Sequence, residues 1–330
     1  MWYISFHGGD DGVNNIRAYD DKGKLATKHV LAKCDDDPPR SELRKFAFGP
    51  DGDLYVVNGY KKYSQILRYK GKPNKDGGHD FVGVFVSKDT VAALVHPFSF
   101  TFDAFGFWYV SNQDTNVVTR LDAKGEPMPV SPYLAQTYPK NKLLPGTFIA
   151  SSKGDLHGVP AAAPDVEPPQ GLHVSVDKDS GKTTHSVRDV LIHWDCLVVA
   201  DEPANAVKIY DGGTGKLITN IVNDRLLAAP VHLLSDDAAI YIGSTGTDAV
   251  LRYDLGSDSL GGFIEGIKSV SGISFGPDGC FYAASRKEQC ILRYDANGKF
   301  IDKFIKDLPD DPEFLLYVPS VSGSGGGGVQ

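Results

Sequence analysis

One short phrase returns seven times along this chain, and its spacing limits the fold more than any single residue does. Each copy opens with apolar or β-branched residues, passes through a polar centre and ends in a second apolar segment, as in residues 240–254 and 281–295. Successive copies start 41 to 54 residues apart, and 51 residues lead from the last copy through the C-terminus to the first. A β-rich repeat of this period is typical of propeller blades. We therefore predict an all-β, seven-bladed β-propeller with copies starting at Trp2, Leu54, Trp108, Leu156, Leu197, Ile240 and Phe281.

Each copy predicts a β-hairpin, because alternating apolar and polar residues are the period-two pattern of half-buried strands. A short apolar strand and a tight turn precede the hairpin, as at residues 45–52 and 272–279, where Pro-Asp-Gly forms the turn. Pro presets the bend and Gly accepts a positive φ. A second turn and an outer strand follow. This gives four antiparallel strands per blade, named A to D from the axis outward.

The two ends of the chain are predicted to share the first blade. Trp2 opens a B strand that has no A strand before it, and the apolar run Phe314–Val318 remains after the last D strand, Lys299–Lys306. Joining the ends in one sheet removes the edges that an open ring would expose. We expect residues 1–320 to form a single domain and the Gly- and Ser-rich residues 321–330 to be a flexible tail.

The blade motif resembles the NHL repeat. Residues 270–301 carry an apolar pair, Gly-Ile, Pro-Asp-Gly, Phe-Tyr, a polar loop, Ile-Leu-Arg-Tyr-Asp and Gly-Lys-Phe in that order, and residues 46–69 are similar. The resemblance covers most of the chain and fades through the fourth blade. It implies a propeller, and its members include proteins that bind protein or RNA, metal-assisted lyases and lactonases. In the similar seven-bladed virginiamycin B lyase group, the B strand carries Trp-Phe-Thr-Glu. Here the phrase is Tyr-Val-Val-Asn, Tyr-Val-Ser-Asn or Tyr-Ile-Gly-Ser, so that group's metal-binding glutamate and its partner histidine are not matched.

Composition narrows the partners and the compartment. The 34 Lys and Arg against 42 Asp and Glu give a net charge of −8, which argues against nucleic acid as a partner because phosphates would be repelled. No apolar run reaches membrane-spanning length, and the N-terminus lacks a signal-peptide pattern. Four cysteines could form two disulfides, but their strand positions favour free, buried thiols: Cys34, Cys196, Cys280 and Cys290. We expect a monomeric cytoplasmic protein, and a chain that opens inside a strand is also compatible with a removed signal peptide.

Loop length gives the functional signal. B–C loops and D–A connections of a propeller lie on one face, and the long B–C loops of this chain are at residues 7–12, 59–63 and 160–170 of blades one, two and four. The D–A connection at residues 129–145 is also long. A ring that needed only stability would have no reason to enlarge one sector, although drift in tolerant surface loops is the alternative. The residues predicted to bind ligand here are Arg44, Lys45, Tyr60, Tyr63, Tyr133 and Tyr138.

Inner-strand starts converge on the axis. Aligning the blades on their A–B turns places there Glu42, Arg44, Lys45, His96, Ser99, Thr147, Arg188, Asp189, His232, Ser269, Ser271, Asp311 and Glu313. Histidines with acids and an arginine around one cavity are suited to hold a divalent cation (Ca, Mg or Zn) or to transfer protons. We therefore name His96, His232 and Glu42 as candidate metal ligands and, together with Arg44, as candidate catalytic residues.

A structural role is the alternative for both histidines. His96 could set a turn with Pro97, and His232 takes the position that an apolar packing residue fills in two other blades.

Two functions remain open. The first is binding of a small molecule or peptide, anionic or carbonyl-bearing, at the axial mouth on the B–C face, because Arg44 and Lys45 make that mouth locally positive. The second is a metal-assisted lyase or lactone hydrolase that uses His96, His232 and Glu42 in the same pocket. No Gly-x-Ser-x-Gly, Cys-x-x-Cys, His-Glu-x-x-His or phosphate-binding loop occurs. The missing lyase pattern favours binding.

Overall fold

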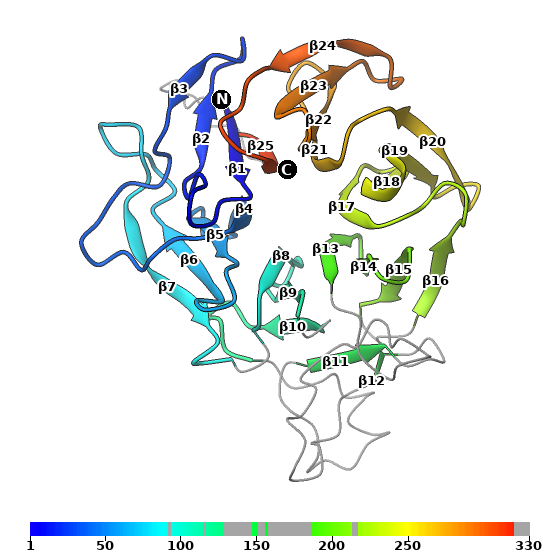
Figure 1. The fold of residues 1–330 in the computed structure, drawn as a ribbon. Helices are drawn as coiled ribbons and strands as arrows, with labels where there is room; N and C mark the ends of the chain where they lie inside the picture. The colour runs from blue at the N-terminus through cyan, green and yellow to red at the C-terminus, as the bar shows by residue number, and fades with distance from the viewer. Residues whose placement is uncertain are drawn as a thin grey trace.

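The chain is an all-β propeller of six blades (Figure 1). The computed structural model describes residues 1–91, 94–114, 117–127, 147–150, 156–157, 186–212 and 217–319. Five of its sheets have four antiparallel strands and one has five. The prediction of seven blades is wrong.

The blades follow one another around the axis in chain order, each with its innermost strand first. Blade one consists of β25 (Pro312–Tyr317), β1 (Trp2–Phe6), β2 (Arg17–Tyr19) and β3 (Leu25–Thr27). Blade two consists of β4 (Leu43–Phe48), β5 (Leu54–Asn58), β6 (Gln65–Tyr69) and β7 (Phe81–Ser87). Blade three consists of β8 (Pro97–Phe102), β9 (Trp108–Asn112), β10 (Val117–Leu121), β11 (Thr147–Ala150) and β12 (Leu156–His157). Blade four consists of β13 (Val187–His193), β14 (Cys196–Asp201), β15 (Ala206–Asp211) and β16 (Leu217–Val222). Blade five consists of β17 (Pro230–Ser235), β18 (Ala239–Ser244), β19 (Ala249–Asp254) and β20 (Ser259–Glu265). Blade six consists of β21 (Val270–Phe275), β22 (Phe281–Ser285), β23 (Cys290–Tyr294) and β24 (Phe300–Ile305).

Among the described residues, the predicted fourth blade does not form a sheet of its own. Thr147, expected at the start of an inner strand, instead pairs with Thr119 of β10, so β11 is the fourth strand of blade three and β12 adds a fifth. On the axial side, β13 packs directly against β8. The second strands of blades three and four start at Trp108 and Cys196, which are 88 residues apart, a distance that two repeats also fill. Counting repeat starts therefore gave one blade too many.

Ring closure is as predicted. β25 pairs with β1 in antiparallel register, with Trp2 opposite Tyr317 and Ile4 opposite Leu315. The N-terminal ammonium of Met1 lies 3.0 Å from the Val318 carbonyl oxygen. The C-terminal strand is thus the innermost strand of the blade that holds the N-terminus (Figure 1).

Burial follows the order of strands from the axis. Every residue of β1, β5, β9 and β22 is buried, because second strands have a blade on each face. Outer strands such as β7 and β16 begin with alternating exposed and partly buried residues. Aromatic rings join neighbouring blades: the Trp2 and Tyr282 rings are 4.2 Å apart and the Tyr55 and Trp108 rings 4.7 Å apart. Such pairs contribute beyond the area that they bury.

All four cysteines are free thiols. Cys290 is buried and Cys196 and Cys280 are partly buried, but Cys34 is exposed, so the expectation of burial fails for that one residue.

Candidate functional site

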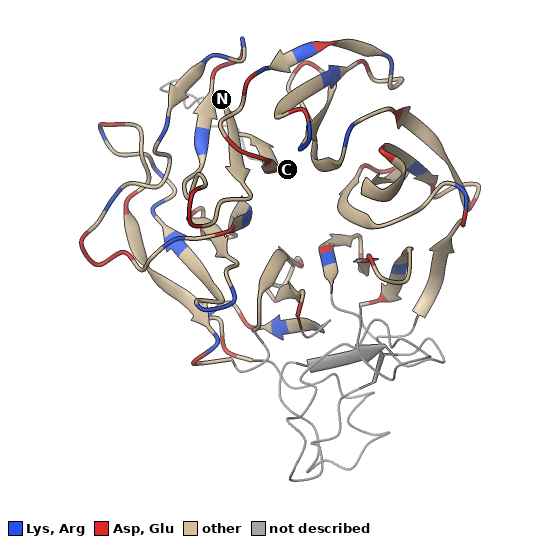
Figure 2. Cartoon of the chain, viewed as in Figure 1, with Lys and Arg blue, Asp and Glu red and all other residues tan. Residues whose placement is uncertain are grey.

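The inner strands bulge at one end of the axis, and this bulge positions the polar side chains of the mouth. In β4 the pairing with β5 jumps from Leu43 opposite Asn58 to Phe46 opposite Val56, so that Arg44 and Lys45 face a single residue. The inner strands of the other five blades are shifted in the same way. A bulge of this kind re-aims side chains. Figure 2 shows charged segments of β4, β13 and β25 facing the centre of the ring.

Left-handed backbone precedes the inner strands. Glu42 (φ 53°), His96 (φ 51°) and Ser269 (φ 54°) each stand one residue before an inner strand, and the same position is left-handed in two further blades. A non-glycine residue in this conformation costs about 1–3 kcal/mol. Because the strain recurs in five blades, it belongs to the architecture of the blade and does not mark one site.

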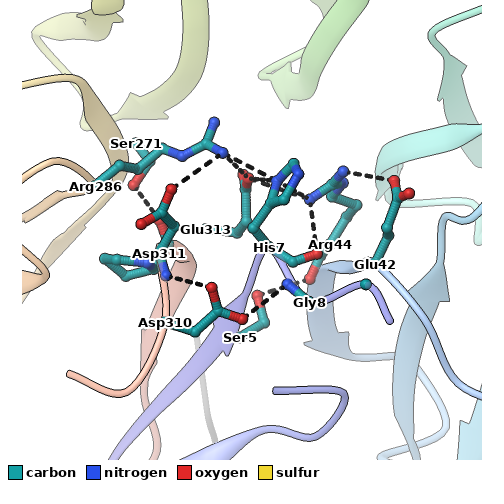
Figure 3. Close-up of polar contacts among 12 residues, drawn as sticks. Ser5, His7, Gly8, Glu42, Arg44, Ser271, Arg286, Asp310, Asp311 and Glu313 are labelled. Atoms are coloured by element: carbon teal, nitrogen blue, oxygen red, sulfur yellow. Dashed lines mark hydrogen bonds and ion pairs between the residues drawn. The ribbon is translucent and has the colours of Figure 1, made fainter. Parts of the chain in front are cut away.

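Glu313 is the centre of the mouth (Figure 3). Its side chain is only 2% exposed, and Oε1 lies 3.1 Å from Arg44 Nη1, 3.3 Å from Arg286 Nη2 and 3.0 Å from His7 Nδ1. Burial alone would raise the pKa of Glu313, but the charges of Arg44 and Arg286 and the hydrogen bond with His7 outweigh it and hold this pKa far below its usual range. Glu313 is therefore an ionised carboxylate that joins blades six, one and two.

A row of alternating charges continues from Arg44 to the rim. Arg44 Nη2 donates to Glu42 Oε2 at 2.8 Å, and His96 Nε2 lies 3.2 Å from the same oxygen. His96 Nδ1 lies 2.9 Å from Asp114 Oδ1, whose other oxygen is 2.9 Å from Lys61 Nζ. Burial would lower the pKa of His96, but hydrogen bonds to Asp114 and Glu42 outweigh burial and raise it. His96 is thus held as an imidazolium between two carboxylates.

Replacing His96 with Gln should lower the free energy of unfolding by about 2 kcal/mol near pH 6, since a hydrogen bond to a charged group contributes about 1.5–3 kcal/mol. The folded-state pKa of His96 is raised. Its contribution is therefore complete below the unfolded value of about 6.5 and is lost as pH rises through the folded value. Urea unfolding of both proteins from pH 5.5 to 9 measures the difference. The control is His29→Gln, which changes an exposed histidine. If His96→Gln lowered the free energy of unfolding equally at every pH, a protonated His96 between Glu42 and Asp114 would be contradicted.

Asp189 is a second buried hub, deeper along the axis. It accepts hydrogen bonds from Lys45 Nζ at 3.0 Å, from the Ser99 hydroxyl and from the backbone N–H of Leu233 at 3.0 Å. These donors come from blades two, three and five, and Asp189 itself lies in blade four. Of the adjacent bulge residues, Arg44 thus pairs with Glu313 and Glu42, whereas Lys45 pairs with Asp189. Together, Glu313 and Asp189 tie all six blades around the axis.

His232 lies in the packed part of the axis, as the structural alternative held. Its ring stands 5.6 Å from the Phe98 ring and 4.2 Å from the Phe314 ring. Complete burial lowers the pKa of His232 to about 4, so the ring is neutral at pH 7. Its nearest carboxylate oxygen, on Asp189, is 3.9 Å away.

His232 therefore does not share a ligand set with His96 and Glu42, and both ring nitrogens of His96 already face carboxylates. Within the described ranges, no three His, Cys, Asp or Glu side chains are grouped so that they could hold a metal ion. The residues named for a divalent cation do not fit one in this arrangement, and a bound cation stays a prediction for metal titration to test.

The predicted loop residues divide into two groups. The Tyr60 and Tyr63 rings contact each other at 5.6 Å at the exposed tip of the blade-two loop, and the same loop sends Lys61 to Asp114. Tyr133 and Tyr138 lie outside the described residues.

Two partly exposed arginines at the mouth were not recognised as a pair from the sequence. Arg286, missed entirely, is 27% exposed, and Arg188 is 23% exposed with Nε 2.7 Å from Glu202 Oε2. A positional signal exists: the first residue after the second strand of a blade joins the mouth in four of six blades, as His7, Gln113, Glu202 and Arg286.

The position that carries glutamate in the lyase phrase has a structural role here. Asn58 Oδ1 accepts from the Ser41 N–H at 2.9 Å, and Asn112 Oδ1 accepts from the Val95 N–H at 3.1 Å. Ser244 binds the same connection in its own blade. These side chains hold the D–A connections in place.

The fold and site define the chain as a six-bladed propeller with an ion-paired axial mouth. No protein-family model matches the chain, and no curated protein matches it. Solved structures match in fold. A chain of a nidogen–laminin complex aligns with a TM-score of 0.59 at 12% identity, over 96% of this chain and 97% of that chain.

A protein of unknown function from Bacteroides caccae aligns with a TM-score of 0.55 at 12% identity, over 95% of this chain and 97% of that one. A streptogramin B lyase aligns with a TM-score of 0.52 at 14% identity, over 84% and 88%. Identities this low show the propeller fold alone. The described residues include no helix long and apolar enough to span a membrane.

Proposed function

We propose that this protein is a binding propeller that takes a carboxylate-bearing small molecule or acidic peptide at the axial mouth. The observation that carries the proposal is the convergence of three arginines, of which Arg44 is buried while the side chains of Arg188 and Arg286 are partly exposed. The charges of Arg188 and Arg286 both reach Arg44 and help to lower its pKa, after burial itself. Guanidinium groups match the two oxygens of a carboxylate.

Binding has more support than the lyase or hydrolase alternative. A general base needs a free lone pair within reach of a substrate proton. His232 is buried, and His96 directs both ring nitrogens at carboxylates. His7, 45% exposed, is the most exposed histidine of the mouth, and its Nδ1 lies 3.0 Å from both Arg44 and Arg286. The ionisable groups of the mouth are thus arranged mainly as ion pairs, with Arg188 and Arg286 partly exposed among them.

Replacing Arg286 with Met should weaken binding of a di- or tricarboxylate about tenfold or more, because it removes a charge-assisted hydrogen bond. Calorimetric titration with succinate and citrate measures the affinity, with dimethyl succinate as the uncharged counterpart. Arg188→Met should act in the same direction. Arg293→Met is the matched control. Arg293 lies on β23, outside the mouth, is 26% exposed and pairs at 2.7 Å with Asp302 of the neighbouring strand β24. Equal affinities in Arg286→Met and Arg293→Met, or no binding of either carboxylate, would reject the proposal.

A further inference from the structure

A cavity separate from the axial mouth lies between blades one and two. Its volume is about 540 Å³, within the range of small-molecule sites. The blade-one loop between β1 and β2 forms one wall, with Gly12, Val13, Asn14 and Asn15. The connection from blade one to blade two forms the other, through residues between Lys28 and Arg40. None of the residues that line this cavity belongs to the network around Glu313 or Asp189.

Every charged side chain that lines the cavity is basic. These side chains are Arg17, Lys28, Lys33 and Arg40, with His29 beside them, and no Asp or Glu lines the cavity. The protein has a net charge of −8, so four basic side chains around one cavity make its lining differ in sign from the protein as a whole. Such a concentration of one sign attracts anions.

The cations are incompletely neutralised. Arg40 Nη2 is 3.6 Å from Asp37 Oδ2, and Arg40 Nη1 donates to the Leu31 carbonyl at 3.1 Å. In the described part of the chain, neither lysine of the cavity nor Arg17 lies within ion-pair distance of a carboxylate. The Nε of Arg17 is buried and has no hydrogen-bond partner. A buried donor without a partner costs free energy, and an acceptor that reached this nitrogen would recover that cost.

Hydrogen bonds fix the walls before any ligand arrives. The buried Asn15 side chain donates to the Leu31 carbonyl and accepts from the Leu31 N–H, both at 3.0 Å. Asp310 accepts from the N–H groups of Gly8 and Val13 at 3.1 and 2.9 Å, which ties the blade-one loop down. A Cβ atom on Gly8, where φ is +71°, would stand 2.4 Å from Asn14 Oδ1, so the loop depends on glycine at this position. The cavity is therefore preformed, which lowers the entropy cost of binding.

We propose that this cavity binds a small molecule that carries several tetrahedral oxyanions, as phosphate or sulfate groups. A single carboxylate would leave most of the four cations unmatched, whereas a ligand of three or more negative charges satisfies them together. Two arginines at the cavity suit such groups, because guanidinium donors form paired hydrogen bonds with oxyanions. The site is independent of the axial mouth, and neither proposal requires the other.

Calorimetric titration with inorganic triphosphate tests the site, with a trisulfated disaccharide and citrate in parallel. The Lys28→Glu/Lys33→Glu double variant reverses two exposed charges and should weaken binding about 100-fold or more. The matched control is Lys22→Glu/Lys24→Glu, which makes the same charge change on exposed residues of the same blade that do not line the cavity. We expect the control to retain affinity within about threefold. Arg286→Met should leave triphosphate binding unchanged, which separates this site from the mouth.

The proposal is supported if triphosphate or the trisulfated disaccharide binds and only Lys28→Glu/Lys33→Glu weakens that binding. The probe with the higher affinity shows whether the ligand carries phosphate or sulfate groups. Equal losses in the two double variants would show a general effect of net charge and overturn the proposal. It would also be overturned if neither probe bound below 1 mM, or if Lys28→Glu/Lys33→Glu weakened citrate binding as much as triphosphate binding.

Discussion

Replacing Arg44 with Ala should lower the free energy of unfolding by about 3–5 kcal/mol, because it leaves the buried Glu313 carboxylate without its nearest cation. The Arg44 side chain is only 4% exposed and pairs with both Glu42 and Glu313. Urea unfolding of the wild type and the variant at pH 7 measures the effect.

Two further variants isolate the cause. Arg293→Ala removes an arginine from a surface pair with Asp302 and should cost about 1 kcal/mol or less. Combining Arg44→Met with Glu313→Leu removes both charges and should restore part of the lost stability, since the cost arises from an unpaired buried ion. A loss below about 1 kcal/mol for Arg44→Ala would show that Glu313 does not depend on this arginine.

Deleting residues 312–330 should abolish cooperative folding, whereas deleting residues 320–330 should leave it intact. The longer deletion removes β25, and with it Phe314 and Leu315 of the core and the carboxylate of Glu313. Two large apolar side chains and one ion-pair hub contribute about 5 kcal/mol or more, comparable to the whole stability of a typical domain. The longer deletion also exposes the edge of β1 to pairing with other chains.

Thermal unfolding with size-exclusion chromatography compares the two truncations. The longer deletion should give aggregates or a broad transition, and the shorter one a melting temperature within a few degrees of the full chain. Equal melting temperatures would contradict a stabilising role for the closing strand.

The sequence predicted most blades correctly because their turns and hairpins carry local signals. The Pro-Asp-Gly turns and the alternation of apolar residues are properties of a few adjacent residues. The error at Leu156 concerned pairing. A short apolar segment has the same pattern whether it is the second strand of its own blade or an added strand at the outer edge of the preceding one. Only contacts across the sheet, such as Thr119 with Thr147, decide between them.

The site was predicted in outline for a similar reason. Blade alignment placed Arg44, Asp189 and Glu313 at the axis, where the structure has them as ion-pair partners or hubs. It did not separate the depths along the axis, so His96 at the rim and His232 in the packed interior were grouped into one ligand set. The depth of each side chain depends on the bulge, where two adjacent residues such as Arg44 and Lys45 lie opposite one residue and contact different carboxylates.

The location of Glu313 also affects how this protein matures in a cell. The strand that carries it is the last of the ring to be synthesised, yet its partners Arg44 and Arg286 belong to blades that emerge from the ribosome earlier. Until β25 has emerged, a nascent propeller holds these arginines without their shared counterion and leaves β1 without its inner neighbour. The ring can therefore close only after β25 has left the ribosome. Nascent chains stalled before residue 312 should be sensitive to proteases in blade one, and released chains should not.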